Sequence, residues 1–161
     1  MSVRVRDYYD GDEAFLWEML YQSIYVPKGE EELPRSILDE PAIAKYLKGW
    51  GRFGDMALVA EADGRQVGAV WARLFDEANK GYGYVDSMTP EIGIAVVPEY
   101  RGQGIGGRLM RGIEMRAKSA GFRRLSLSVD PQNPAVRFYE RLGYVHVGWS
   151  GTSSTMVKAL A

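Results

Sequence analysis

A dense group of glycines directly after a β-branched segment constrains this chain more than any other feature. Residues 92–97 are apolar and largely β-branched, which predicts a buried strand that ends at Pro98. The segment 101–107 then reads Arg-Gly-Gln-Gly-Ile-Gly-Gly. A helix is predicted over 104–120, with Gly121 as its C-terminal cap. Its apolar positions recur every four residues, at Ile105, Leu109 and Ile113. The glycines therefore lie where a loop becomes the N-terminus of a helix.

A helix start of this composition favours anion binding. Its first N–H groups have no partner within the helix, and the helix dipole adds partial positive charge there. Glycines let the backbone approach a phosphate closely because no Cβ intervenes. A tight turn alone needs one or two glycines, whereas four of the six residues from Gly102 to Gly107 are glycine. We therefore favour a phosphate-binding loop over a plain turn.

One alternative is a dinucleotide site, because Gly102-x-Gly104-x-x-Gly107 formally matches that fingerprint and Asp130 ends the next predicted strand. Residues 98–101, however, separate the first strand from the first glycine. Only 31 residues follow Asp130, which is too few to complete a doubly wound sheet. A P-loop is excluded because no Lys-Ser or Lys-Thr pair directly follows the last glycine of the segment, as that motif requires.

A second motif fits the glycine segment better than the dinucleotide fingerprint does. Arg101-x-x-Gly104-x-Gly106, after a strand that ends in Val-x-Pro, resembles the acetyl-coenzyme A loop of the GNAT acetyltransferase superfamily. The block 133–144, Asn-Pro-Ala-Val-Arg-Phe-Tyr-Glu-Arg-Leu-Gly-Tyr, resembles the late helix of that family, with Tyr144 in place of the usual phenylalanine. The resemblance runs from residue 91 to 149 without a large gap. The first 90 residues match only in the order of their elements, so the acceptor side is not predicted.

The coarse pattern of the whole chain agrees with this resemblance. Asp10 and Glu13 resemble a capping box that begins a first helix, and Asp63-Gly64 is typical of a hairpin turn. Strands are predicted at 3–6, 55–62, 66–74, 92–97, 124–129, 144–149 and 152–157, and further helices at 40–48, 104–120 and 134–142. This order implies an α/β GNAT fold, a mixed sheet with helices on both faces. We expect it to form a single domain over residues 1–161.

Composition excludes several functions. Lys and Arg total 20 and Asp and Glu 21, so the net charge of −1 leaves no electrostatic footprint for nucleic acid or an anionic membrane. No apolar run approaches the ~18 residues of a membrane span. The first residues lack the apolar core of a signal peptide, so the expected location is cytoplasmic. Cysteine is absent and histidine occurs once, so we expect no metal site and no cysteine acyl-enzyme.

The resemblance assigns the cofactor-binding residues, with acetyl-CoA as co-substrate. Backbone N–H groups of the central strand are expected to bind the thioester carbonyl, at Ile94, Ala95 and Val96. The glycine loop is expected to hold the pyrophosphate through Arg101, Gly102, Gln103, Gly104, Ile105, Gly106 and Gly107. Arg101 has the alternative of a solvated side chain. Asn133 is expected to bind the pantetheine arm, to cap the helix that follows, or both.

Two residues are candidate catalysts. Tyr139 is expected to protonate the leaving thiolate, with packing in the core beside Phe138 as the alternative. Glu91 is expected to act as the base, directly or through water, with a solvated carboxylate at the strand end as the alternative. His146 is expected to be a structural strand residue. The tryptophans are expected in the core or in the wall of a cleft, at Trp17, Trp50, Trp71 and Trp149.

The sequence therefore predicts an N-acetyltransferase that moves the acetyl group of acetyl-CoA to a primary amine by direct attack in a ternary complex. A non-catalytic acyl-CoA-binding sensor is the alternative. The acceptor is a small-molecule amine or a peptide amine, and nothing in the first 90 residues separates these. Because members of the family often pair through their late strands, a homodimer is one expectation.

Overall fold

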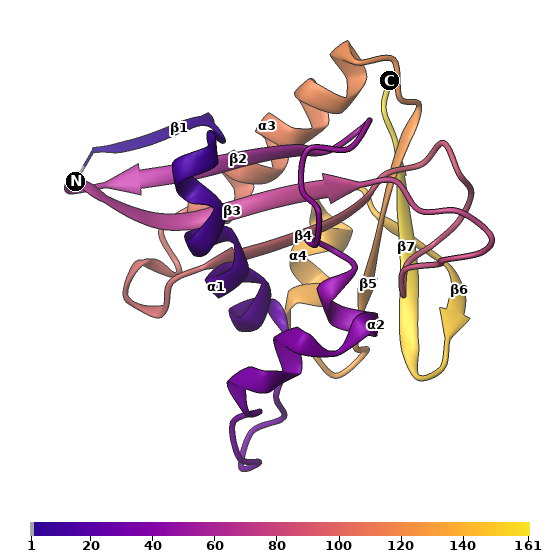
Figure 1. Cartoon of the computed structure of the whole chain (residues 1–161), viewed down its shortest axis with the longest axis horizontal. Coiled ribbons are helices and arrows are strands. Elements are labelled where there is room, and N and C mark those ends of the chain that lie inside the picture. Colours follow the sequence, from indigo (N-terminus) through magenta and orange to yellow (C-terminus); the bar gives the residue numbers. More distant parts are fainter. Residues whose placement is uncertain (1) are drawn as a thin grey trace.

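Seven strands form one mixed sheet in the computed structural model, which describes residues 2–161 (Figure 1). The strands are β1 (Val3–Asp7), β2 (Met56–Ala62), β3 (Arg65–Arg73), β4 (Glu91–Val96), β5 (Arg124–Val129), β6 (Val145–Ser150) and β7 (Ser153–Ala159). The α-helices are α1 (Glu13–Ser23), α2 (Pro41–Ala44), α3 (Ile105–Ser119) and α4 (Ala135–Arg141). Short 3-10 turns cover Asp10–Asp12, Arg35–Asp39 and Pro98–Tyr100. The predicted order of strands and α-helices is confirmed, and most ends differ by one or two residues.

The strand order is β1-β2-β3-β4-β5-β7-β6. The pairs β1–β2, β2–β3 and β3–β4 are antiparallel, as are β5–β7 and β7–β6. Only β4 and β5 run parallel, and they share a single register pair, Glu91 with Ser126. Beyond that pair the two strands diverge, which Figure 1 shows as an opening angle near the centre of the sheet. This divergence creates the opening in which the candidate active site lies.

Helices cover both faces of the sheet, as predicted. In Figure 1, α1 crosses in front of the sheet and α3 lies behind it. The predicted apolar stripe of α3 is buried at Ile105, Leu109, Met110, Ile113 and Ala117, and α1 buries Leu16, Met19 and Leu20. The α/β fold class expected from the resemblance is confirmed. No helix within residues 2–161 is long and apolar enough to cross a bilayer.

The predicted helix over 40–48 is much shorter in the structure. Only Pro41–Ala44 is α-helical, and turns continue to Gly49, which has a φ of +68°. The cause is the fully buried guanidinium of Arg73, which donates to the carbonyls of Lys45 and Lys48 at 2.8 and 2.7 Å. The same guanidinium pairs with the buried Asp55 at 2.8 Å. Arg73, on a distant strand, therefore donates hydrogen bonds to carbonyls that would otherwise accept N–H groups within a longer helix.

The predicted capping box at Asp10 and Glu13 is wrong in its details. The carboxylate that organises this helix start is Asp12, which accepts the backbone N–H of Tyr9 at 3.0 Å. Asp12 is buried and also accepts both terminal nitrogens of Arg6 at 2.8 and 2.9 Å. The guanidinium from β1 makes burial of that carboxylate favourable, and the local pattern alone does not contain this information.

The hairpin turn at Asp63-Gly64 is confirmed. Both residues have positive φ, 53° and 76°, as a type I′ turn between β2 and β3 requires. This turn sets the register of the long antiparallel pair on which β4 is built.

Candidate active site

The divergence of β4 from β5 leaves backbone N–H groups without strand partners. The N–H of Val97 donates to Val67 in β3 at 2.8 Å. Because N–H direction alternates along an antiparallel strand, Ala95 also faces β3, whereas Ile94 and Val96 face the side from which β5 has departed. Of the three residues predicted to present N–H groups, two therefore point into the opening.

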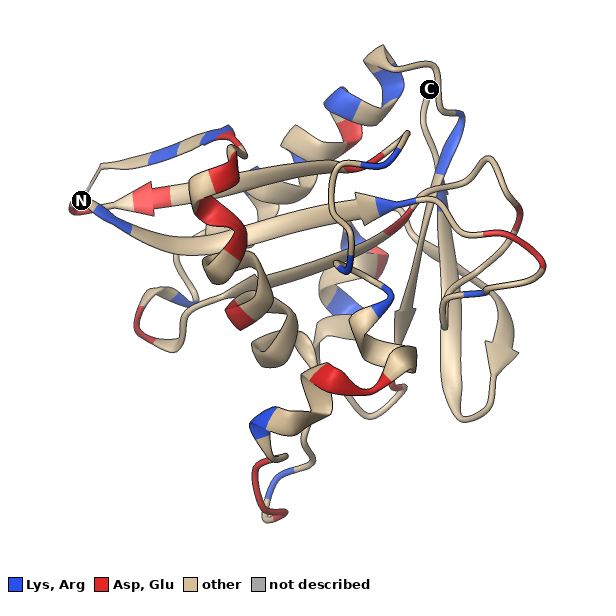
Figure 2. Ribbon diagram, in the orientation of Figure 1, with Lys and Arg blue, Asp and Glu red and all other residues tan. Residues whose placement is uncertain are grey.

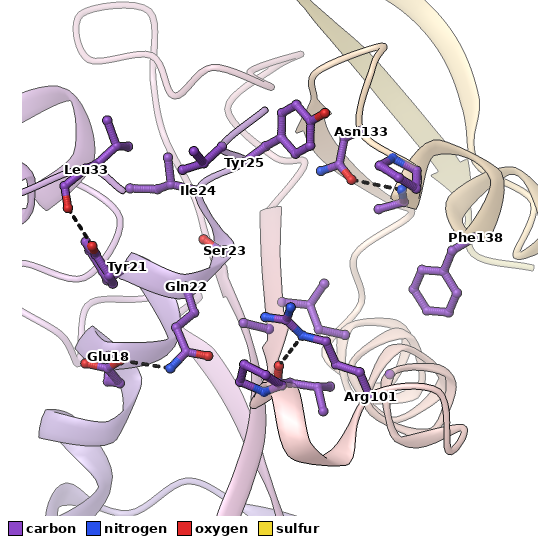
Figure 3. Close-up of a pocket in the computed structure, with 18 of the residues that line it drawn as sticks. Glu18, Tyr21, Gln22, Ser23, Ile24, Tyr25, Leu33, Arg101, Asn133 and Phe138 are labelled. Atoms are coloured by element: carbon purple, nitrogen blue, oxygen red, sulfur yellow. Dashed lines mark hydrogen bonds between the residues drawn. The ribbon is translucent and has the colours of Figure 1, made fainter. Parts of the chain in front are cut away.

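A cleft of about 870 Å³ occupies this opening (Figure 3). One wall comes from α1 and the segment after it, and the other from the glycine loop and α4. Most of the predicted site residues line it: Ile94, Ala95, Val96, Arg101, Gly106, Asn133 and Tyr139. The volume lies within the ~300–1,000 Å³ typical of ligand pockets.

The glycine loop has the geometry that its sequence predicts. Gly102 and Gly104 have φ of +78° and +82°, and Gly104 is the N-cap of α3. A Cβ at either position would meet nothing within 4 Å, so space is open on the outer side of the loop. Ile105 is buried in the core, so only its backbone is free to bind a ligand. These features fit a phosphate held by backbone N–H groups.

The remaining loop residues divide between the cleft and the surface. Gly106 lines the cleft, and an added Cβ would lie 3.4 Å from the Phe138 ring, in ordinary contact. Gln103 lies exposed on the loop, and Gly107 lies one residue further along α3 with Arg111 as the nearest neighbour of an added Cβ. The start of α3 and the side of α4 therefore form adjacent walls of the cleft.

Arg101 has a structural contact that the sequence did not predict. Its Nε donates to the carbonyl of Val96 at 2.9 Å, on the open side of β4 (Figure 3). The side chain is otherwise exposed, so its terminal nitrogens are available to an anion. The bond fixes the guanidinium at the mouth of the cleft.

Asn133 performs the predicted capping role. Its Oδ1 accepts the backbone N–H of Ala135 at 2.9 Å and so begins α4. Figure 3 shows Asn133 beside Tyr25. The Tyr25 hydroxyl donates to the neighbouring Gln132 carbonyl at 3.3 Å, which joins the segment after α1 to the β5–α4 connection. The amide nitrogen of Asn133 is left for a ligand.

Tyr139 lies half-buried in the wall of the cleft. Its ring packs against Phe138 and Tyr144, with centroid distances of 5.4 and 6.2 Å. Its hydroxyl makes no hydrogen bond to any residue between 2 and 161. Burial raises the pKa of Tyr139 to about 12, so the phenol keeps its proton at neutral pH. The ring of Tyr139 therefore packs against its neighbours while its hydroxyl stays available as a proton donor.

Glu91 is buried, contrary to the solvated alternative. The residue is 3% exposed at the start of β4, and its Oε2 accepts the Tyr46 hydroxyl at 2.6 Å. Its Oε1 has no hydrogen-bond partner within the described chain. Burial raises the pKa of Glu91 to about 7, against the lowering effects of Tyr46, the Gly83 backbone and the charge of Lys45. A carboxyl with this pKa can accept a proton near neutral pH.

Glu91 lines a second, smaller cavity of about 270 Å³ rather than the main cleft. The two spaces share four lining residues: Ser23, Ile24, Tyr25 and Asn133. Sequence reasoning missed Tyr46, which holds Glu91 from 45 positions away. No motif marks this tyrosine, so only the folded chain identifies it.

The aromatic and histidine predictions are mostly confirmed. The Nδ1 of His146 lies 2.5 Å from the Ser154 hydroxyl between β6 and β7, as expected of a structural residue. Trp71 is buried and its ring lies against Gly93, where an added Cβ would come within 2.6 Å. Trp149 is 64% exposed on the edge strand β6, so it lies outside the core, and it lines a surface cavity of about 480 Å³.

Comparisons with known proteins agree with the geometry. Residues 15–144 match the family model described as the Acetyltransferase (GNAT) family. An N-acetyltransferase from Staphylococcus aureus Mu50 has a TM-score of 0.73 at 18% identity, with 100% of both chains covered. The PaiA N-acetyltransferase from Thermoplasma acidophilum was solved in complex with coenzyme A. It has a TM-score of 0.72 at 22% sequence identity, with 99% of both chains covered.

A third solved structure is yncA from Salmonella typhimurium, a putative acetyltransferase with its cofactor acetyl-CoA. It has a TM-score of 0.71 at 18% identity and covers 100% of this chain and 95% of its own. These likenesses establish a shared fold, and the family match spans most of the sequence. The chain belongs to the GNAT acetyltransferase family.

Proposed function

We propose that this chain, acting as one domain over residues 1–161, transfers the acetyl group of acetyl-CoA to a primary amine. The observation that carries the proposal is the cleft at the β4–β5 divergence. There the outward N–H groups of Ile94 and Val96 share one space with the unbonded hydroxyl of Tyr139. Such a space offers separate donors for an oxyanion and for a leaving thiolate. PaiA and yncA, which have the same fold, carry coenzyme A and acetyl-CoA respectively.

The residues present fit acetyl-CoA. The backbone from Gly102 to Gly107 supplies free N–H groups and open space for the pyrophosphate, and Arg101 adds a fixed positive charge beside it. The free amide nitrogen of Asn133 is suited to a carbonyl of the pantetheine arm. The thioester then lies where β4 and β5 diverge.

The proposed reaction assigns one task to each group. Glu91, in its carboxylate form, takes a proton from the ammonium of the acceptor, and the neutral nitrogen attacks the thioester carbon. The N–H groups of Ile94 and Val96 stabilise the oxyanion, a contribution of about 3–4 kcal/mol for each such donor. The carbon–sulfur bond breaks, and Tyr139 supplies a proton to the departing thiolate. The amide nitrogen loses its remaining extra proton, which restores Tyr139 through solvent, and Glu91 releases to solvent the proton that it took from the ammonium.

The two alternatives differ in what they bind and release. A sensor binds acetyl-CoA without releasing free CoA in the presence of any amine. A dinucleotide-binding protein prefers NADH to acetyl-CoA. The buried Glu91 and the unbonded Tyr139 hydroxyl favour turnover over simple binding, because neither is needed to hold a cofactor.

We expect saturating acetyl-CoA, at about 100 times its Kd, to stabilise the fold by ~2.7 kcal/mol and to raise the thermal midpoint by roughly 5–10 °C. NADH should produce no such rise. Gly106→Val should lose the rise, because its side chain fills the cleft wall where phosphate must approach. Gly106 gives a clearer test than Gly104, because the φ of +82° at Gly104 would strain the backbone of any substituted residue.

Gly148→Val is the matched control. An added Cβ at Gly148 meets nothing within 4 Å, whereas one at Gly106 lies 3.4 Å from the Phe138 ring. The φ of Gly148 is not positive, and the residue lies on β6 away from the cleft. This variant should keep the full rise with acetyl-CoA. A folded Gly106→Val variant that binds acetyl-CoA normally would remove the glycine loop from the binding site, and a rise with NADH alone would favour the dinucleotide alternative.

A further inference from the structure

The glycine loop is attached to the rest of the protein by very few side chains. Between the buried residues Val97 and Ile105, every residue is exposed except Tyr100, which is partly buried. Two of the exposed residues, Gly102 and Gly104, have positive φ and more conformational freedom than other residue types. A loop of this composition becomes ordered only if residues outside the glycines hold it.

Tyr100 joins the loop to the tip of the β2–β3 hairpin. Its hydroxyl donates to Oδ2 of Asp63 at 3.0 Å, across 37 positions of sequence. The guanidinium carbon of Arg65 lies 5.5 Å from the centre of the Tyr100 ring, and the same guanidinium pairs with Glu99 at 3.6 Å. Figure 2 shows acidic and basic segments on both the hairpin and the loop. We call these four residues the hairpin anchor.

The backbone connects the hairpin anchor to the glycines. Pro98–Tyr100 forms a 3-10 turn, in which the N–H of Tyr100 donates to the carbonyl of Val97 at 3.0 Å. The N–H of Arg101 donates to the carbonyl of Pro98 at 3.2 Å. Only Arg101 separates Tyr100 from the first glycine of the loop. The placement of Tyr100 therefore controls where the loop begins.

The hairpin anchor lies outside the cleft. Asp63, Arg65, Glu99 and Tyr100 do not line it, whereas the next residue, Arg101, does. In Figure 1 the hairpin tip and the loop after β4 lie at the same end of the sheet. A substitution in the hairpin anchor therefore reaches a ligand in the cleft only through the loop.

We propose that Tyr100 is a positioning residue for coenzyme A, and that its bond to Asp63 holds the glycine loop in the conformation that receives the pyrophosphate. The inference rests on the proposed acetyltransferase function and adds the β2–β3 turn to its binding site. A loop that is already ordered raises affinity, because binding then does not have to offset the loss of loop entropy. The effect belongs to cofactor binding, since the hairpin anchor does not border the cleft.

The test is the Kd of CoA, measured by calorimetry on the full chain. Tyr100→Phe removes the hydroxyl and keeps the ring, and Tyr100→Ala removes both. We expect the Kd to rise about threefold in the first variant and about tenfold or more in the second. An unchanged Kd in both variants would overturn the inference.

Tyr84 provides the matched control. Its hydroxyl donates to Glu77 at 3.5 Å, and the ammonium of Lys80 lies 5.5 Å from its ring centre, so its partners are of the same kinds as those of Tyr100. It lies before β4 and does not line the cleft. Tyr84→Phe and Tyr84→Ala should leave the Kd of CoA unchanged. A rise that is equal at the two tyrosines would follow general stability and contradict the inference.

Variants of Asp63 separate the hydrogen bond from the hairpin turn. Asp63 has a φ of +53°, which glycine and asparagine both adopt readily. Asp63→Gly keeps the turn and removes the acceptor, so it should raise the Kd of CoA about as much as Tyr100→Phe. Asp63→Asn keeps an acceptor oxygen and should stay within about twofold of the unmodified protein. Equal losses in the two Asp63 variants would contradict the inference.

The double variant that combines Tyr100→Phe with Asp63→Gly completes the design. Both substitutions break the same bond, so the double variant should bind CoA about as well as either single variant. Losses that multiply would show that the two residues act separately and would contradict the inference. An unmodified protein that does not bind CoA would instead contradict the proposed function itself.

Discussion

Replacing Tyr139 with phenylalanine is expected to lower kcat by about 10²–10³-fold and to leave the Kd of acetyl-CoA within about threefold. The substitution removes one hydroxyl that has no hydrogen-bond partner in residues 2–161 and that borders the cleft. It keeps the ring that packs between Phe138 and Tyr144. Only the hydroxyl that we propose as proton donor for the thiolate is lost, so we expect the effect in the chemical step.

Tyr144→Phe is the matched control for this experiment. Tyr144 lies next to Tyr139, but its hydroxyl donates to Glu114 at 2.9 Å and faces away from the cleft. That variant should lose some stability, because it leaves the partly buried carboxylate of Glu114 with one donor fewer, and should keep most of its kcat. An unchanged kcat in Tyr139→Phe, or equal losses in both variants, would remove Tyr139 from the mechanism.

Replacing Glu91 with glutamine is expected to lower kcat/KM by about 10²–10⁴-fold at neutral pH, the usual range for loss of a general base. The variant should fold. The pKa of Glu91 is raised by burial to about 7, so its ionised form destabilises the fold increasingly as pH rises from the ordinary value of 4.5 through that pKa. Glutamine has no such form. Activity and thermal stability are measured together across pH.

The pH dependence of kcat/KM tests the role of Glu91 as the base most directly. Since the base must be unprotonated, kcat/KM should rise with pH and level off above an apparent pKa of about 7. Tyr139, with a pKa of about 12, keeps its proton over this range and produces no falling limb. Tyr46→Phe removes a hydrogen bond that lowers the pKa of Glu91, so the rising limb should move to higher pH. If the Glu91→Gln variant keeps the rise of kcat/KM at the original pH, that rise is due to the titration of another group.

The parts of the site that were predictable from sequence depend on local signals. The glycine loop, the start of α3 and the cap of α4 at Asn133 are each specified by neighbouring residues. Their backbone requirements, such as the positive φ of Gly102 and Gly104, can be met by few residue types. The resemblance to a family then supplied the spatial relation between these segments.

The surroundings of Glu91, the proposed base, were not predictable because distant segments create them. Glu91 begins a strand, and nothing in its neighbours indicates that it is buried. Its enclosure comes from Tyr46 and from the Gly81 loop, which packs so closely that a Cβ would not fit. Arg73 acts in the same way on α2, whose predicted length ignores a guanidinium from β3. Long-range polar contacts of this kind leave no periodic pattern in the sequence.

The most direct test of the account is a crystal structure of the protein with CoA bound. The pyrophosphate should lie against the backbone of Gly102–Gly107, and the pantetheine should enter between β4 and β5. The decisive measurement is the distance from the sulfur to the Tyr139 hydroxyl oxygen, which should be about 3.5 Å or less, within reach of a hydrogen bond. CoA bound outside the cleft, or a sulfur too far from Tyr139 to accept its proton, would contradict the proposed active site.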